Sequence, residues 1–445
     1  MVLPKAARSA DLEGLRSTLG GVGLWLTCKP HLGRPDRARP GTSLARSRPN
    51  IVILLQESLG AHQWAPWNPA STSSPHVSRF LAENADLAVW FPRATTAAGA
   101  TAVSLPTILT GLPPDAPRSD FMRAPLLWQE ARGLGYRTAL FSAEDFDWAY
   151  FRTYFLGDEG PDVAKVATDF DGAPRVNDSG VDDRLPARAA TDFIDAGEQD
   201  GRPFLVVVQF NATHRPCWAP GLPPDGEARP IRCAAAAAHV DAASAHILDH
   251  LQKVGHLEDT LVFGTADHGE TFRKDRPPRL ESYFDDVTIV PFYLRLPASL
   301  AFLRPGTLAQ VRANRTARIS NLDIYPTILD VWDRWPLVEG SRPRLAGGRS
   351  LLRPIEPDRS LVVVNTGEIH DFNWSHEGFA LYHGRWKWLC DEYDGVRLFD
   401  LEEDPGETIN VDPTTHVAEL TLFQSEVRRR PDLTRILGNI APDLL

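Results

Sequence analysis

The chain alternates between short, continuous apolar runs and longer segments with helical periodicity. Uninterrupted apolar runs indicate strands buried on both faces, as in parallel sheets. Such runs occur at residues 51–55, 138–141, 204–210 and 260–263. Segments with apolar residues at helical spacing lie between or after them, at 124–134, 187–198 and 234–254. We therefore expect an α/β fold with a mostly parallel central sheet and helices on both faces.

The pattern changes after about residue 335. Short strand-like segments separated by turn residues follow, at 361–364, 379–383, 386–390 and 396–399, and then a helical segment near 418–430. These segments predict a small antiparallel sheet with a helix. Residues 1–48 are rich in Arg, Pro and Ser and show no sustained period. We predict a loose N-terminal extension over 1–48, a main catalytic domain over 49–335 and a C-terminal subdomain over 336–445.

The charge pattern argues against a nucleic-acid partner. The chain has 47 basic and 58 acidic residues, for a net charge of −11, and the two signs are interspersed. Nucleic-acid binding requires a basic face, which this pattern does not supply. No apolar run reaches the ~18 residues that a membrane span requires, so no transmembrane segment is expected. The apolar stretch at 19–28 begins late and lacks a convincing cleavage site, so no signal peptide is predicted.

The four cysteines do not form a CxxC pair, so a structural zinc site is not expected. Cys217 and Cys233 flank a proline-rich loop. In an exported protein they could form a disulfide, and otherwise they are two separate thiols.

Polar residues follow three of the predicted strands. Glu57 follows the first run, His214 follows the run at 204–210, and Asp267 and His268 follow the run at 260–263. Ligands of open α/β sheets bind at the carboxyl ends of the strands, so we expect these side chains to lie together. We predict one divalent metal ion on Glu57, Asp267 and His268, with Gly269 permitting the turn. Carboxylate and imidazole ligands favour zinc or manganese, and calcium or magnesium is possible. The alternative is a helix-capping Asp267 beside a surface histidine.

The segment at 95–114 is small and rich in hydroxyl groups and contains Leu-Thr-Gly. Small residues before a helix allow backbone N–H groups to approach an anion. Thr101 and Ser104 lie about one turn apart and could both face the site. The alternative is an ordinary helix start capped by a hydroxyl group. A nearby metal could lower the pKa of a Thr hydroxyl and so activate it as a nucleophile.

Four segments together resemble the alkaline-phosphatase superfamily, in its sulfatase and phosphoethanolamine-transferase branch. They are PNIVILLQES at 49–58, TAVSLPTILTG at 101–111, NATHRPCW at 211–218 and ADHGE at 266–270. The resemblance extends over about residues 49–410. It implies a single metal held by Glu57, Asp267, His268 and the nucleophile Thr101, and it implies that His214 contacts the substrate and takes part in catalysis.

The chain departs from this family pattern at two places. Sulfatases carry Cys or Ser at the nucleophile position, matured to formylglycine, and an Arg where this chain has Leu105. With Thr101 there, we do not expect a formylglycine sulfatase. Relatives also have a His or Lys shortly after the DHGE motif, but no His occurs here between His268 and His370. Four basic residues are available instead, and we select Lys274 as substrate-binding from Arg273, Lys274, Arg276 and Arg279.

The resemblance implies a metal-dependent hydrolase or transferase acting on phosphate- or sulfate-type esters through a covalent Thr101 intermediate. Phosphodiester cleavage or phosphoryl-headgroup transfer is favoured, with a sulfuric ester hydrolase as the first alternative and a non-catalytic binding protein as the second. The substrate would be an anionic ester of a glycan, a lipid headgroup or a small molecule. A serine hydrolase that uses Ser104 and His268 is disfavoured, because the chain has no GxSxG motif. The family points to the cell envelope, but the sequence does not identify the compartment.

Overall fold

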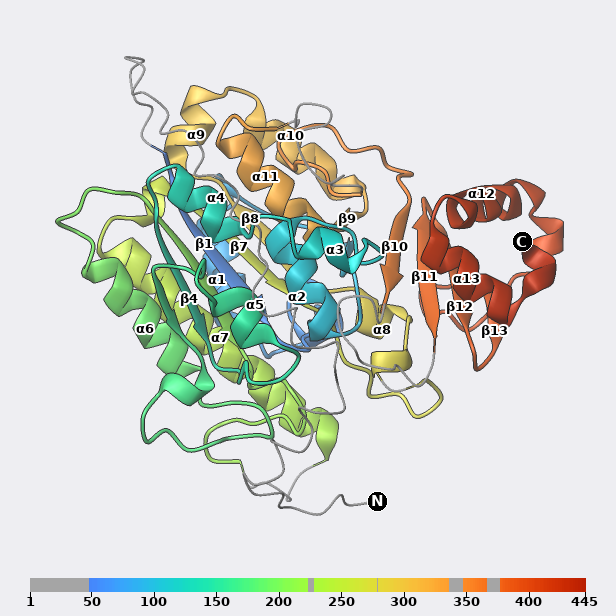
Figure 1. Cartoon of the computed structure of the whole chain (residues 1–445), viewed down its shortest axis with the longest axis horizontal. Helices are drawn as coiled ribbons and strands as arrows, with labels where there is room; N and C mark the ends of the chain where they lie inside the picture. The colour runs from blue at the N-terminus through green and yellow to red at the C-terminus, as the bar shows by residue number, and fades with distance from the viewer. Residues whose placement is uncertain (1–47, 223–227, 278, 336–346, 366–376) are drawn as a thin grey trace, which may run out of the picture. The chain divides into compact units, whose positions relative to one another are not determined.

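The central sheet forms around β1 (Asn50–Gln56), the apolar run that follows Pro49. The computed structural model describes residues 48–222, 228–277, 279–335, 347–365 and 377–445 (Figure 1). Seven strands form the sheet in the order β2-β8-β7-β1-β6-β4-β5. The neighbours of β1 are β6 (Phe204–Phe210) and β7 (Thr260–Ala266), and both run parallel to it. The other strands are β2 (Ala88–Trp90), β4 (Arg137–Ser142), β5 (Val163–Lys165) and β8 (Phe292–Arg295).

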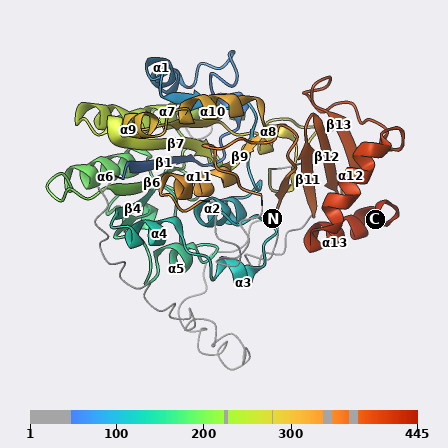
Figure 2. The same ribbon diagram turned by 90° about the horizontal axis from the view of Figure 1, so that it is seen from above.

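Both faces of the sheet are buried, as the continuous apolar runs predicted. Alternate residues of β1 point to opposite faces, so Ile51 and Ile53 enter one core and Val52 and Leu54 enter the other. Helices α2, α4 and α11 pack in the first core, and α1, α6 and α7 pack in the second. Figure 2 shows β7, β1, β6 and β4 in succession, with α1 and α7 towards β7 and α4 towards β4. The predicted α/β class, with helices on both faces, is confirmed.

The helices of the described residues are mostly short. The helices before β8 are α1 (Pro75–Glu83), α2 (Thr101–Thr110), α3 (Arg118–Phe121), α4 (Leu127–Gly133), α5 (Phe151–Leu156), α6 (Arg184–Asp195), α7 (Arg229–Lys253) and α8 (Asp285–Thr288). Those after it are α9 (Ala298–Leu303), α10 (Thr307–Ala313), α11 (Ile324–Val331), α12 (Val417–Arg428) and α13 (Pro431–Ile440). Within the described ranges, no helix is long and apolar enough to cross a bilayer.

A second, antiparallel sheet follows in the C-terminal part, as predicted. Its strands are β10 (Leu361–Val364), β11 (Gly378–His383), β12 (Trp386–Asp391) and β13 (Gly395–Asp400), hydrogen-bonded in that order. Helices α12 and α13 share a core with it, and the ring of Trp388 stacks on Phe423 with centroids 4.4 Å apart. A two-stranded sheet, β3 (Ala94–Thr95) with β9 (Ile319–Ser320), completes the strands of the described ranges.

The sequence pattern did not reveal the two edges of the central sheet. Strands β2, β5 and β8 are only three or four residues long, too short for a periodic signal. Strand β8 is antiparallel to β7, and β2 is antiparallel to β8, so the sheet is mixed at one edge. The predicted extension over 1–48 lies almost wholly outside the described residues. Residues 46–445 form one compact unit, and the division near 335 remains a prediction.

A buried lysine links the C-terminal sheet to α8. The Lys387 side chain is fully buried, and its ammonium group donates to Asp285 at 2.6 Å and to Glu407. The Tyr382 hydroxyl donates to the same Asp285 carboxylate, also at 2.6 Å. Burial alone would raise the pKa of Asp285, but the charges of Lys387 and Arg318, together with the hydrogen bonds from Lys387 and Tyr382, lower it. Removing the ammonium group would take one cation from the partly buried Asp285 and from the buried Glu407, which also lies 3.4 Å from Arg276.

We expect Lys387→Met to lower the free energy of unfolding by about 3–5 kcal/mol, the usual cost of breaking a buried ion pair. The measurement is the midpoint of urea unfolding, followed by tryptophan fluorescence. Lys165→Met is the matched control, because Lys165 lies on β5 and is exposed. Equal midpoints for the two variants would show that the buried cation does not stabilise this contact.

Candidate functional site

The register of the central sheet brings the candidate site together. Gln56, the last residue of β1, pairs with Phe210 of β6 on one side and Ala266 of β7 on the other. The next residues, Glu57 and Asp267, therefore emerge side by side at the carboxyl edge. Backbone hydrogen bonds continue past the strands, from Glu57 N to Phe210 O at 3.0 Å and from Asp267 N to Gln56 O at 3.1 Å.

Glu57, Asp267 and His268 form a buried cluster. Each offers one possible ligand atom, and these atoms lie within 4.8 Å of one another. His268 Nε2 is 3.6 Å from Glu57 Oε1 and 3.5 Å from Asp267 Oδ2. The structure thus brings together the three residues that the sequence proposed as metal ligands.

The donor atoms in this cluster fit a divalent cation. Asp267 Oδ1 accepts hydrogen bonds from the backbone N–H groups of Ser58 at 3.0 Å and His268 at 2.7 Å. Asp267 Oδ2 is buried and has no hydrogen-bond partner among the described residues. His268 Nδ1 lies 2.8 Å from the carbonyl oxygen of Gly269, which leaves the lone pair of Nε2 for the cluster. A buried, unpaired carboxylate oxygen is costly, and a cation would offset this cost.

The electrostatics of the cluster favour the metal-binding protonation states of Glu57 and His268 but not that of Asp267. Burial would raise the pKa of Glu57, but the charges of His268, His214 and Arg279 lower it to about 2. Burial lowers the pKa of His268 to about 4, so its imidazole is neutral at pH 7. Burial and the charge of Glu57 raise the pKa of Asp267 well above its usual value. This repulsion between carboxylates is what a bound cation relieves.

Thr101 points into the cluster and Ser104 does not. Thr101 is the first residue of α2, and its Oγ1 lies 3.0 Å from both carboxylate oxygens of Glu57 and 3.1 Å from His268 Nε2. The Ser104 hydroxyl instead donates to the carbonyl oxygen of Asp267 at 2.6 Å. Among the contacts of the described residues, none joins Ser104 to His268. The geometry therefore supports Thr101, not Ser104, as the hydroxyl of this site.

An arginine that the sequence did not single out completes the site. Arg279 Nη2 lies 3.0 Å from His214 Nε2, and Arg279 Nη1 lies 3.3 Å from Glu57 Oε1. A guanidinium group only donates, so His214 Nε2 accepts and its Nδ1 carries the proton. That Nδ1 lies 2.9 Å from Asp178 Oδ1. His214 and Asp178 thus orient a cationic group beside Glu57.

Lys274, the predicted substrate contact, is not brought to the cluster. Its side chain is exposed, and within the described part of the chain no contact links it to Glu57, Thr101 or His268. Arg279, five residues later, occupies that place. The sequence offered both residues in one basic segment but gave no means of choosing, because the path of a loop is not periodic. His239 lies 3.0 Å from Asp182 and packs against Trp218.

A disulfide joins Cys217 to Cys233, with their Cα atoms 5.0 Å apart. Of the two possibilities that the sequence left open, the structure has the bridged one. The bond connects the loop after His214 to the beginning of α7. It therefore anchors the loop that carries His214.

Comparison with known proteins identifies the family of the chain. A family model for sulfatases matches residues 49–333. Arylsulfatase K of Bos taurus is 28% identical over 246 residues, which cover 47% of this chain and 42% of that protein. Choline-sulfatase of Rhizobium meliloti (strain 1021) is 27% identical over 197 residues, which cover 41% and 33%.

The fold is also similar to that of a solved structure, a putative sulfatase from Bacteroides thetaiotaomicron. The TM-score is 0.64 at 17% identity, with 87% of this chain and 94% of that chain covered. The chain spans less than half the length of the curated relatives it matches. The family model, however, matches well over half of this chain and includes every residue of the cluster. The chain belongs to the sulfatase family.

Proposed function

We propose that the chain is a metal-dependent hydrolase of sulfate esters with Thr101 as its nucleophile. The observation that carries the proposal is the position of Thr101 Oγ1, within 3.1 Å of both Glu57 and His268. The sequence alone favoured phosphoryl transfer, but the matches to sulfatases support the sulfuric ester alternative better. The fold neighbour is consistent with either chemistry.

Glu57, Asp267 and His268 would hold the cation, with Thr101 beside it. When bound, a zinc or manganese ion would lower the pKa of the Thr101 hydroxyl and reduce the repulsion between the anionic ester and the buried carboxylates. Thr101 would lose its proton to water, and its Oγ1 would form a bond to sulfur as the bond from sulfur to the alkoxide oxygen breaks. The alkoxide would take a proton from solvent. Water would then cleave the Thr101 sulfate, release hydrogen sulfate and restore the hydroxyl.

Arg279 would bind the sulfonyl oxygens, and His214 would hold its guanidinium group in place. Arg279 supplies a fixed positive charge, and its side chain is only 13% exposed, so solvent screens that charge little. Since His214 Nε2 accepts from Arg279, the contact supports a positioning role for the imidazole. The beginning of α2 adds backbone N–H groups and the positive end of the helix dipole near Thr101.

One observation favours a second function, the hydrolysis of phosphodiesters. Thr101 cannot be oxidised to formylglycine, the hydrate of which expels sulfate by elimination. A Thr sulfate must be attacked directly by water, whereas a phosphoryl group on Thr can be displaced in line. Thr101 is therefore the residue on which the choice between sulfur and phosphorus depends.

We expect Thr101→Ala to lower kcat by at least about 10³-fold, because the nucleophile is removed. Thr101→Ser keeps the hydroxyl and should retain measurable turnover. The methyl and hydroxyl groups of Thr101 contribute little to the core, so the melting temperature should change by only a few degrees. Turnover by Thr101→Ala together with loss of turnover in Ser104→Ala would reassign the nucleophile to Ser104.

We expect purified protein to contain about one divalent ion per chain, zinc or manganese, measured by elemental mass spectrometry. Asp267→Asn should reduce this content several-fold, because a neutral amide binds a cation more weakly. Asp275→Asn is the control, since Asp275 is an exposed carboxylate that pairs with Arg273. An unchanged metal content in Asp267→Asn would exclude this carboxylate as a ligand.

We expect kcat/KM for an aryl sulfate to exceed that for the matched aryl phosphate and aryl phosphodiester by at least about tenfold. A steady-state assay with the same phenol as leaving group measures this ratio. A higher kcat/KM for either phosphorus ester would reverse the order and make phosphodiester hydrolysis the better assignment.

A further inference from the structure

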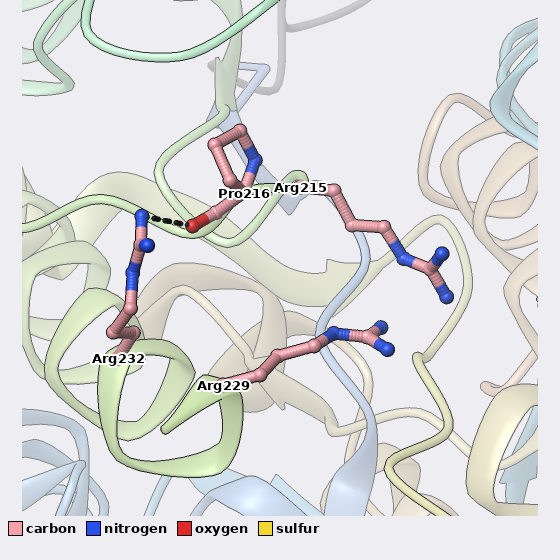
Figure 3. A pocket seen from close by; sticks show the side chains of 4 residues that line it. All are labelled: Arg215, Pro216, Arg229 and Arg232. Carbon is pink, nitrogen blue, oxygen red and sulfur yellow. Dashed lines mark hydrogen bonds between the residues drawn. The ribbon is translucent and has the colours of Figure 1, made fainter. Parts of the chain in front are cut away.

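A cavity lined by three arginines lies beside the site. Its volume is about 270 Å³, and its lining residues are Arg215, Pro216, Arg229 and Arg232. Figure 3 shows Arg215 and Arg229 extending in the same direction, with Arg232 on the other side of Pro216. Arg215 is the neighbour of His214 in the sequence. The other two arginines come from the first turn of α7.

Two of these guanidinium groups share one buried carboxylate. Glu270 accepts from Arg215 Nε at 2.8 Å and Nη2 at 3.0 Å, and its Oε2 lies 2.9 Å from Arg229 Nη2. The Glu270 side chain is 1% exposed, whereas those of Arg215 and Arg229 are each 41% exposed. One negative charge thus lies beneath two positive charges that reach solvent. Arg215 Nη1 has no hydrogen-bond partner within the described part of the chain.

The stability of α7 does not explain why Arg229 and Arg232 lie in its first turn. Positive side chains in the first turn of a helix face the positive end of the helix dipole, an arrangement that is unfavourable by a few tenths of a kcal/mol. The first turn of α7 contains Arg229 and Arg232 and has no acidic residue. An anion in the cavity would interact favourably with both arginines and with the helix end.

The walls of the cavity are held in place without a ligand. The Cys217–Cys233 disulfide joins the residue after Pro216 to the residue after Arg232. Arg232 Nη2 also donates to the carbonyl oxygen of Pro216 at 2.6 Å and to that of Cys217 at 3.1 Å. The guanidinium carbon of Arg229 lies 5.3 Å from the centre of the Phe272 ring. A site whose donors are already positioned loses less entropy on binding.

The cavity and the candidate site share two short segments. Arg215 directly follows His214, which contacts Arg279, and Glu270 lies two residues after His268. The charge of Glu270 acts on His268, and the charge of Arg279 acts on Glu270. A ligand that places an ester at Thr101 can therefore extend a second group towards the arginines.

We propose that this cavity binds a second anionic group, a sulfate or a carboxylate, on the same molecule whose ester is cleaved. Guanidinium groups recognise both anions through paired, charge-assisted hydrogen bonds. This inference rests on the proposed hydrolysis at Thr101 and specifies its substrate class as a molecule with at least two anionic groups. A sulfated oligosaccharide with two such groups has the required chemistry.

The test compares a disaccharide carrying one sulfate with the same disaccharide carrying two. Arg229→Gln is the variant, because Glu270 keeps its bidentate contact with Arg215. The ratio of kcat/KM for the disulfated to the monosulfated substrate should fall at least about tenfold, the effect of one charge-assisted hydrogen bond. Arg202→Gln is the matched control, since Arg202 is an exposed arginine before β6, at the opposite edge of the sheet. In Arg202→Gln, the ratio of kcat/KM for the two disaccharides should equal that of the wild-type chain.

Binding measured by titration calorimetry separates this inference from the proposed function. If the wild-type chain cleaves neither these disaccharides nor the aryl sulfate, the proposed hydrolysis fails, but tighter binding of the disulfated disaccharide, lost in Arg229→Gln, still supports the anion site. Competition by inorganic sulfate measures how well the cavity binds a free anion, and weaker competition in Arg229→Gln supports the site. Equal ratios and equal affinities in Arg229→Gln and Arg202→Gln would overturn the inference.

Discussion

The site depends on the parallel register of three neighbouring strands. Gln56 pairs with Phe210 and with Ala266, so β1, β6 and β7 end level with one another at the carboxyl edge of the sheet. A shift of one residue in β7 would reverse which side chains face each core and would move Asp267 away from Glu57. The hydrophobic alternation that buries both faces of β1 therefore also fixes the distance between the two carboxylates. Core packing and site geometry are consequences of the same backbone hydrogen bonds.

Much of the fold was predictable because its signals are local. The four long apolar runs became β1, β4, β6 and β7, and the late strand-like segments became the antiparallel sheet. The juxtaposition of Glu57, Asp267 and His268 also followed, since the ends of parallel strands meet at one edge. Gly269 was predicted to permit a turn, but its φ is not positive, so the backbone conformation does not require a glycine. A Cβ there would lie 2.4 Å from Asp286 O and 3.0 Å from Gly60 Cα, so close packing is what requires it.

The features that sequence reasoning missed depend on tertiary contacts without a period. Arg279 reaches His214 and Glu57 from a loop, and its sequence neighbours Arg273 and Lys274 are equally basic. The pairing of Lys387 with Asp285 joins residues 102 positions apart, and nothing in either segment indicates the other. The cavity was missed for a similar reason. Arg215 and Arg229 are brought together only by Glu270, which comes from a third segment and contacts both.

The two walls of the arginine-lined cavity are covalently linked only when the Cys217–Cys233 disulfide is formed. The proposed ligands Glu57, Asp267 and His268 lie at strand ends and owe their positions to the sheet, so the proposed metal site does not depend on this bond. In molecules with two free thiols, the loop that carries Arg215 and the beginning of α7 are no longer tied together. Two preparations with the same metal content but different disulfide content can then differ in their preference for substrates with two anionic groups over those with one. A thiol titration of each preparation measures the fraction of molecules in which the arginine-lined wall is covalently fixed.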